Sequence, residues 1–175
     1  MTTPGGGFIA PNFDDETERK MTIICSKGTL DMAYPGLIIG NGALQEGIET
    51  HLFFTFWGLD IIRKSTVDKL TMTPAGNTAM RVGSTSFAMP QLLGVLPGMS
   101  SVASWMMRGK IKGLSVPTVH EFLTQIHEAG GHLWACKMSV DMMKLEKADF
   151  IDEVEDIINV SDFLELSRDA QILFT

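Results

Sequence analysis

The sequence holds two cysteines, Cys25 and Cys136, among 175 residues. Two cysteines are too few for a disulfide-built scaffold, and neither belongs to a Cys-x-x-Cys pair of the kind that binds zinc or does dithiol chemistry. The histidines and cysteines have no zinc or iron spacing, so we predict that no metal is needed. Residues 1–19 contain no apolar segment followed by a small-residue cleavage site. We therefore predict no signal peptide and a cytoplasmic location, where both thiols start free.

Nucleotide-binding and hydrolase motifs are also missing. The sequence contains no Gly-x-x-x-x-Gly-Lys-[Ser/Thr], no Gly-x-Gly-x-x-Gly after a strand and no Gly-x-Ser-x-Gly. These absences disfavour a nucleotide cofactor and a serine hydrolase, and we predict that the protein uses no cofactor.

Charge is unevenly spread along the chain. The net charge of −7 arises in residues 139–175, and the sequence has no Lys/Arg cluster of the nucleic-acid-binding type. Nucleic acid is therefore not an expected partner. From Lys69 to His120 the sequence has five basic residues and no acidic one. This stretch can attract a small anion, or it can be a solvated surface with uneven charge.

An uncharged run extends from Val82 to Met107. It is long enough to cross a bilayer, which takes about 20 apolar residues, but Pro90, Gly94 and Pro97 interrupt it. We predict no membrane span. The alternative is a Met-rich insertion at about 57–115, buried against the domain or against another subunit, and we therefore predict a homo-oligomer.

The remaining pattern predicts a single domain at 20–175, preceded by a mobile arm at 1–19. Short apolar runs predict strands, and apolar residues at helical spacing predict the helices between them. Strands and helices alternate, which is typical of an α/β fold: a flavodoxin-like, open, mainly parallel sheet of four or five strands with helices on both faces. The strands are expected at 20–25, 49–55, 132–136, 157–158 and 171–175, and the helices at 31–46, 118–129, 140–147 and 162–168. Thr118 and Glu121 have the spacing of a capping box at the start of the second helix, and Ser161 is expected to cap the last one.

Cys136 is the first candidate for chemistry, because it ends a predicted strand. In open parallel sheets, ligands bind outside the carboxyl ends of the strands. Lys137 follows directly, and Ser139 is expected to cap the next helix. A neighbouring ammonium and a helix N-terminus both favour the thiolate. The alternative is a buried, inert cysteine.

Cys25 ends the first strand in the same way. In the strand order 2-1-3-4-5 this strand neighbours the one that carries Cys136, so both thiols would open on one edge of the sheet. The following Ser26, Lys27 and Gly28 can hold an anion on their backbone N–H groups.

Three segments resemble the DsrE/DsrF-like family, in particular its longer branch with a Met-rich insertion. They are Phe53-Phe-Thr-Phe-Trp-Gly58, Trp134-Ala-Cys-Lys-Met-Ser-Val-Asp-Met-Met143 and Ser161-Asp-Phe-Leu-Glu-Leu166. The resemblance implies a flavodoxin-like fold, assembly as dimers, trimers or hexamers, and membership of a family that includes sulfur-relay proteins. In those proteins a cysteine at the sheet edge carries sulfane sulfur as a persulfide. By motif this role falls on Cys136, and Cys25 is not the family's carrier.

We therefore predict a sulfur carrier or cysteine-dependent sulfurtransferase with Cys136 as nucleophile and Cys25 as a possible second thiol. Its partners would be sulfur donor and acceptor proteins or small sulfur compounds. The predicted substrate-binding residues are Ser26, Lys27, Gly28, Lys137 and Ser139. Two other functions remain open: a nucleotide- or acyl-binding module that Cys136 merely lines, and a docking subunit of a redox complex that binds through the insertion.

Overall fold

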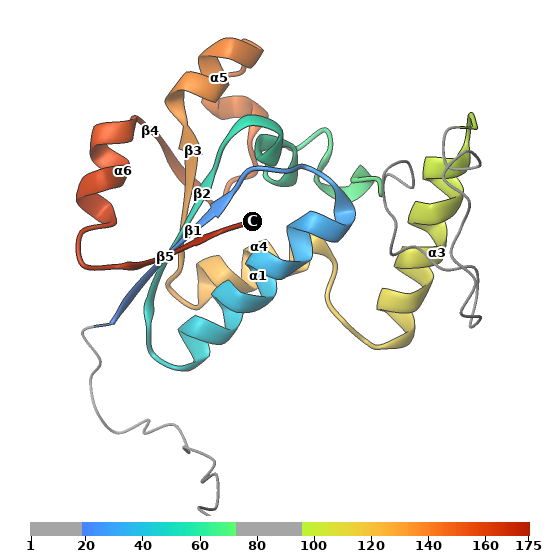
Figure 1. The fold of residues 1–175 in the computed structure, drawn as a ribbon, viewed down its shortest axis with the longest axis horizontal. Coiled ribbons are helices and arrows are strands. Elements are labelled where there is room, and N and C mark those ends of the chain that lie inside the picture. The colour runs from blue at the N-terminus through green and yellow to red at the C-terminus, as the bar shows by residue number, and fades with distance from the viewer. Residues whose placement is uncertain (1–18, 73–95) are drawn as a thin grey trace, which may run out of the picture.

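A five-stranded parallel sheet forms the centre of the molecule. The computed structural model describes residues 19–72 and 96–175, so the predicted arm, except Arg19, and positions 73–95 of the predicted insertion lie outside the described residues. The strand order is β4-β3-β2-β1-β5, and every neighbouring pair is parallel (Figure 1). The predicted fold class is confirmed. The strands are β1 (Lys20–Cys25), β2 (Glu49–Phe54), β3 (His132–Cys136), β4 (Val154–Ile158) and β5 (Gln171–Phe174).

Helices cover both faces of this sheet. Helices α1 and α4 pack together on one face, while α6 lies on the opposite side (Figure 1). Helix α5 follows β3 at the carboxyl edge of the sheet, and α3 stands apart from the sheet at the far side of α1 and α4. The α-helices are α1 (Leu30–Gln45), α3 (Met99–Gly113), α4 (Val119–Glu128), α5 (Lys137–Met143) and α6 (Val160–Leu166); the 3₁₀ helices are η1 (Phe56–Ile61), η2 (Val67–Lys69) and η3 (Lys147–Asp149).

Each face of the sheet has its own core. On the α1/α4 face, α4 buries Val119, Phe122, Leu123 and Ile126 at the helical spacing that the sequence predicted. Its N-terminus carries the predicted capping box, in which Thr118 and Glu121 bond each other's backbone N–H. The opposite face has a smaller core under α6, made of Phe53, Cys136, Ile158 and Phe163.

The strand order differs from the one on which the pairing of the two thiols was predicted. Strand β2 lies between β1 and β3. Five of its six residues are buried, so it needs neighbours on both edges and cover on both faces, whereas β5 is largely exposed and lies at the edge.

The register then separates the thiols completely. Cys25 lies opposite Phe54, and Phe54 lies opposite Ala135. Residues in register share a face and successive residues alternate, so Cys136 points to the other side of the sheet from Cys25. Both cysteines end their strands at the carboxyl edge of the sheet, as predicted, but the predicted pairing of the two thiols on neighbouring strands is wrong.

Two predicted helix caps are also wrong. Helix α5 begins at Lys137, so its N-cap is Cys136 rather than Ser139, because the Ser139 hydroxyl bonds Thr55 and Phe56 instead. Helix α6 is capped by Asn159, whose side-chain oxygen accepts the N–H groups of Ser161 and Asp162 at 2.7 and 3.1 Å.

Within the described segments, no helix is long and apolar enough to span a bilayer. The described part of the predicted insertion contains α3, which is held to the body by two polar contacts. The Ser104 hydroxyl accepts the Met72 N–H at 2.8 Å, and Arg108 donates to the Leu70 carbonyl at 2.6 Å. Trp105 on this helix is 75% exposed.

Candidate functional site

Cys136 stands where β3 ends and α5 begins. Its backbone is extended, and as the N-cap residue it precedes the first free N–H groups of α5. The side chain is 3% exposed. It packs among Phe53, Ile158 and Phe163 on the α6 face. No loop separates β3 from α5, because the strand ends at Cys136 and the helix begins at the next residue. This places the thiol next to the backbone N–H groups of the first turn of α5.

Polar contacts make this thiol more acidic than usual. Burial works to raise the pKa of Cys136, but hydrogen bonds from the Thr55 and Ser139 hydroxyls, and from the backbone N–H groups of Ser139 and Met138, outweigh it and hold the pKa below its usual value. These donors therefore stabilise the thiolate over the thiol, and the thiolate is the nucleophilic form.

The two hydroxyls are themselves fixed in place. Ser139 is fully buried, and its Oγ lies 3.0 Å from Thr55 Oγ1. The backbone N–H of Phe56 donates to Ser139 Oγ at 2.9 Å. Because Ser139 Oγ already accepts this bond, its own proton is free to point at the sulfur or at Thr55. The residues around Cys136 thus form a prearranged set of donors.

The backbone of η1 holds Thr55 and Phe56 at that position. Phe56 adopts a left-handed conformation, with φ of 47°. The Thr55 N–H donates to the Cys25 carbonyl at 3.0 Å, and a Cβ on Gly58 would lie 2.0 Å from that same oxygen. Only glycine fits at position 58, so the close approach of η1 to the end of β1 depends on it.

The site residue that sequence reasoning missed is Thr55. The prediction placed β1 next to β3, and so gave no reason to examine the end of β2. In the structure β2 adjoins β3, and the carboxyl ends of these two strands bring Thr55 and Cys136 together. A signal was present, because Thr55 lies within one of the three segments that carry the family resemblance.

Cys25 has the opposite properties. It is buried in the core under α1, and a Cβ added to Gly36 would lie 2.9 Å from its sulfur. Burial raises the pKa of the Cys25 thiol to about 12, despite a hydrogen bond with Thr175. Both cysteines are free thiols, but they lie on different faces of the sheet and form no common site.

The loop after β1 packs against η1. Ser26 bonds the chain end through its N–H and its hydroxyl, both to the Thr175 carbonyl at 2.9 Å, and its own carbonyl accepts the Gly58 N–H at 3.1 Å. A Cβ on Gly28 would lie 2.2 Å from the Trp57 carbonyl. Lys27 is exposed at the same edge of the sheet.

Lys137 does not act on the thiol in the way that the sequence predicted. Its ammonium is exposed and pairs with Asp141 one turn further along α5, at 2.5 Å. The pKa of Cys136 is lowered by hydroxyl and backbone N–H donors, and Lys137 is not among the groups that lower it.

The histidines in the strands have structural partners. His51 and His132 stack with ring centroids 4.7 Å apart, and each bonds a carboxylate, Glu49 and Glu155 respectively. Trp134 Nε1 donates to His51 Nδ1 at 3.1 Å. Across residues 19–72 and 96–175, no three His, Cys, Asp or Glu side chains are grouped so that they could hold a metal ion.

Comparison with known proteins agrees with this geometry. The model of the DsrE/DsrF/DrsH-like family matches residues 17–174. The chain belongs to this family. It is 36% identical over 156 residues to the sulfur carrier protein DsrE2 of Allochromatium vinosum, covering 89% of this chain and 96% of that protein. The uncharacterized protein YrkE of Bacillus subtilis is 26% identical over 150 residues, covering 80% of this chain and 86% of that protein.

Two solved structures share the fold of this DsrE/DsrF/DrsH-like chain. The ychN protein of E. coli aligns with a TM-score of 0.52 at 11% identity, over 90% of this chain and 99% of that one. The protein MTH1491 of Methanobacterium thermoautotrophicum aligns with a TM-score of 0.53 at 7% identity, over 90% and 100%. At these identities the likeness concerns the fold alone.

Proposed function

We propose that this protein is a sulfur carrier that holds sulfane sulfur as a persulfide on Cys136, and that it acts as a cysteine-dependent sulfurtransferase in a sulfur relay. The family match, and the relative named as a sulfur carrier protein, support the carrier role at the level of the family. The observation that carries the proposal is the set of hydroxyl and backbone N–H donors that lowers the pKa of this one thiol.

The proposed reaction is thiol exchange in two steps. The Cys136 thiolate attacks the outer sulfur of a sulfane donor. An S–S bond to Cys136 Sγ forms, the donor's own bond to that sulfur breaks, and the electron pair leaves with sulfite or with the donor's thiolate. An acceptor thiolate then attacks the outer sulfur of the persulfide, and the Cys136 thiolate departs. No net oxidant is consumed, and no metal or nucleotide takes part.

Each neighbouring group has a role in this scheme. Thr55, Ser139 and the two N–H groups stabilise Cys136 as the attacking thiolate and again as the leaving group. The ammonium groups of Lys27 and Lys137, both exposed at the carboxyl edge of the sheet, attract an anionic donor; because they are exposed, their contribution is small and falls with salt.

The donor and acceptor must approach over an apolar surface. Four large apolar side chains of η1 and α5, the two elements that hold the thiol, are exposed: Phe56, Trp57, Met138 and Met142. We call them the apolar rim. Since Cys136 itself is almost covered, we infer that the apolar rim moves to admit a small sulfane donor, and that a protein partner packs on the same rim to reach the thiol. Exposed aromatic and Met side chains are typical of such contacts.

Intact mass spectrometry tests the proposal directly. After incubation with thiosulfate or polysulfide, the wild-type protein is expected to gain one sulfur atom, and a reductant is expected to remove it. The thiol must be free for this reaction, which fits a reducing cytoplasm. A protein that gains no reducible sulfur from either donor would contradict the carrier role.

We also propose that the protein is a homo-oligomer, as the uncharged run at 82–107 predicts. In the described part of this run, Leu96, Val102 and Trp105 are exposed on or next to α3, an arrangement that a subunit contact would cover. Sedimentation equilibrium at micromolar concentration is expected to show a dimer or a larger assembly, and Trp105→Ser is expected to weaken it. Purely monomeric wild-type protein would overturn this prediction.

A further inference from the structure

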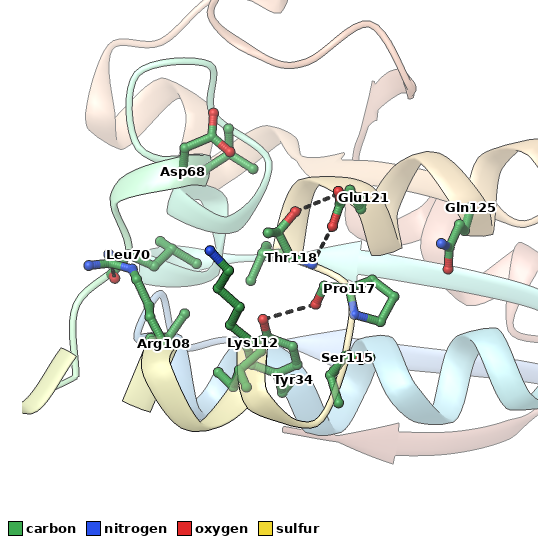
Figure 2. Close-up of a pocket in the computed structure, with 15 residues that line it drawn as sticks. Tyr34, Asp68, Leu70, Arg108, Lys112, Ser115, Pro117, Thr118, Glu121 and Gln125 are labelled. Carbon is green, nitrogen blue, oxygen red and sulfur yellow. Dashed lines mark hydrogen bonds between the residues drawn. The ribbon is translucent and has the colours of Figure 1, made fainter. Parts of the chain in front are cut away.

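A cavity lies on the α1/α4 side of the sheet, whereas Cys136 faces the α6 side. The cavity has a volume of about 750 Å³ and lies between the start of α1, η2, the end of α3 and the start of α4 (Figure 2). This volume lies in the range of small-molecule sites. Neither Cys136 nor any residue that hydrogen-bonds its sulfur lines the cavity. The proposed sulfur chemistry therefore does not account for it.

The floor of the cavity is apolar and fixed. Leu30, Val67, Leu70 and Val119 line it, and each is nearly fully buried. Tyr34 closes one side: its hydroxyl donates to the Pro117 carbonyl at 3.1 Å, and its ring meets Phe122 edge-on. Figure 2 shows this hydrogen bond at the base of the cavity. Such a floor accepts a hydrocarbon or aromatic group.

Charged groups line the other side of the cavity, and they differ in whether another residue already binds them. The Glu121 carboxylate accepts the Thr118 N–H at 2.7 Å in the α4 capping box, and Asp68 lies 3.6 Å from His120. Both acids therefore have partners. Arg108 donates to the Leu70 carbonyl and retains further N–H donors.

Among the charged groups that line the cavity, Lys112 has no partner within residues 19–72 and 96–175. No hydrogen bond or ion pair joins its ammonium to another residue in the part of the chain that the structure describes. Figure 2 shows the side chain reaching across the cavity, with its ammonium between Leu70 and Thr118. A cation above an apolar floor, with a second lining cation, Arg108, four residues earlier on the same helix, matches a molecule with one anionic end and one apolar end.

We propose that this cavity binds a small amphipathic anion, a carboxylate with a medium-length hydrocarbon body, whose acid group pairs with Lys112 and Arg108 and whose body lies on Leu30, Val67 and Val119. The acid-free stretch from Lys69 to His120 supplies both cations. Of the two interpretations of that stretch, attraction of a small anion is the one that this geometry favours.

Calorimetric titration of the full-length protein with decanoate tests the proposal, with decylamine and decanol as probes of charge. Decanoate is expected to bind saturably at one site per chain. Lys112→Gln is expected to weaken binding about tenfold, because it removes a charge-assisted hydrogen bond. Lys110→Gln is the matched control: it removes an exposed cation from the same helix, outside the cavity, and is expected to leave binding unchanged.

Three outcomes would overturn the proposal. They are the absence of saturable decanoate binding, equal weakening by both lysine substitutions, and decanol or decylamine binding as tightly as decanoate. The melting temperature of each variant shows whether it is folded. If Lys112→Gln melts at a lower temperature than Lys110→Gln, Lys112→Arg is tested in its place. This variant keeps the positive charge and is expected to retain binding. Decanoate is also expected to leave the alkylation rate of Cys136 unchanged, and a decanoate-induced change would refute the separation of the two sites.

Discussion

Replacement of Cys136 by serine is expected to abolish sulfur loading. The serine hydroxyl keeps the shape of the side chain, but it has no thiolate form that can attack a sulfane sulfur at neutral pH. The measurement is the intact mass after incubation with thiosulfate or polysulfide. Wild-type protein should gain one reducible sulfur atom per chain, and Cys136→Ser should gain none.

Cys25→Ser is the matched control, because it removes the other thiol. With a pKa of about 12, Cys25 is ionised in roughly 10⁻⁵ of molecules at pH 7, and its sulfur is packed beneath α1. Loading of Cys25→Ser should therefore equal that of wild type, and limited iodoacetamide should modify Cys136 first in the native protein. Reducible sulfur on Cys136→Ser, or faster alkylation of Cys25, would show that the wrong thiol has been assigned.

The elements that the sequence predicts best are those whose boundaries are marked by local chemistry. Strands β1 and β3 lie at the predicted positions because each is an apolar run that ends in cysteine followed by polar residues. Helix α4 begins at its predicted cap because Thr118 and Glu121 satisfy each other's backbone N–H within four residues. Such signals involve residues close together in the sequence, so they can be recognised from one amino-acid sequence alone.

Strand order, unlike element boundaries, cannot be predicted from local sequence. It depends on which strand is buried on both faces of the sheet. The alternation of strands and helices is the same for every order, and the apolar runs of β1 and β3 gave no sign that β2 separates them. Only the register, with Cys25 opposite Phe54 and Phe54 opposite Ala135, reveals that the two thiols face opposite ways. Cys136 lies one residue beyond the position in register with Cys25. Its side chain therefore faces the other side of the sheet, and the two thiols cannot share a site.

The same cause explains how the candidate site was only partly predicted. Cys136 could be found from its place at a strand end, and Ser139 from its place three residues later. Thr55 could not be found in this way, because it is 81 positions from Cys136 in the sequence and becomes its neighbour only through the pairing of β2 with β3. Two reasons for a reactive thiolate were predicted. The helix N-terminus is present, in the backbone N–H groups of Met138 and Ser139, whereas hydroxyl donors that a spacing rule does not detect take the place of the Lys137 ammonium.

Removal of these uncharged donors should raise the pKa of Cys136. Ser139→Ala and Thr55→Val each delete one hydroxyl that bonds the sulfur. A hydrogen bond to a charged group contributes about 1.5–3 kcal/mol, and one pKa unit corresponds to about 1.36 kcal/mol. At the lower end of that range, which suits an uncharged hydroxyl donor, each variant should raise the thiol pKa by about one unit. The wild-type midpoint, measured from the pH dependence of reaction with a dipyridyl disulfide, should lie below that of an ordinary cysteine thiol.

The direction of the rate change should depend on pH, and this dependence makes the test specific. Below both pKa values a variant has about tenfold less thiolate, but each thiolate is about threefold more nucleophilic, since nucleophilicity rises with pKa with a Brønsted slope of about 0.4–0.5. The variant should therefore react about threefold more slowly near pH 7 and about threefold faster once both thiols are fully ionised. Ser161→Ala, which alters an exposed serine of α6 on the same face of the sheet, should follow the wild-type curve. If Ser139→Ala instead changes the rate by one constant factor at every pH, the hydroxyl controls access to Cys136 rather than its charge.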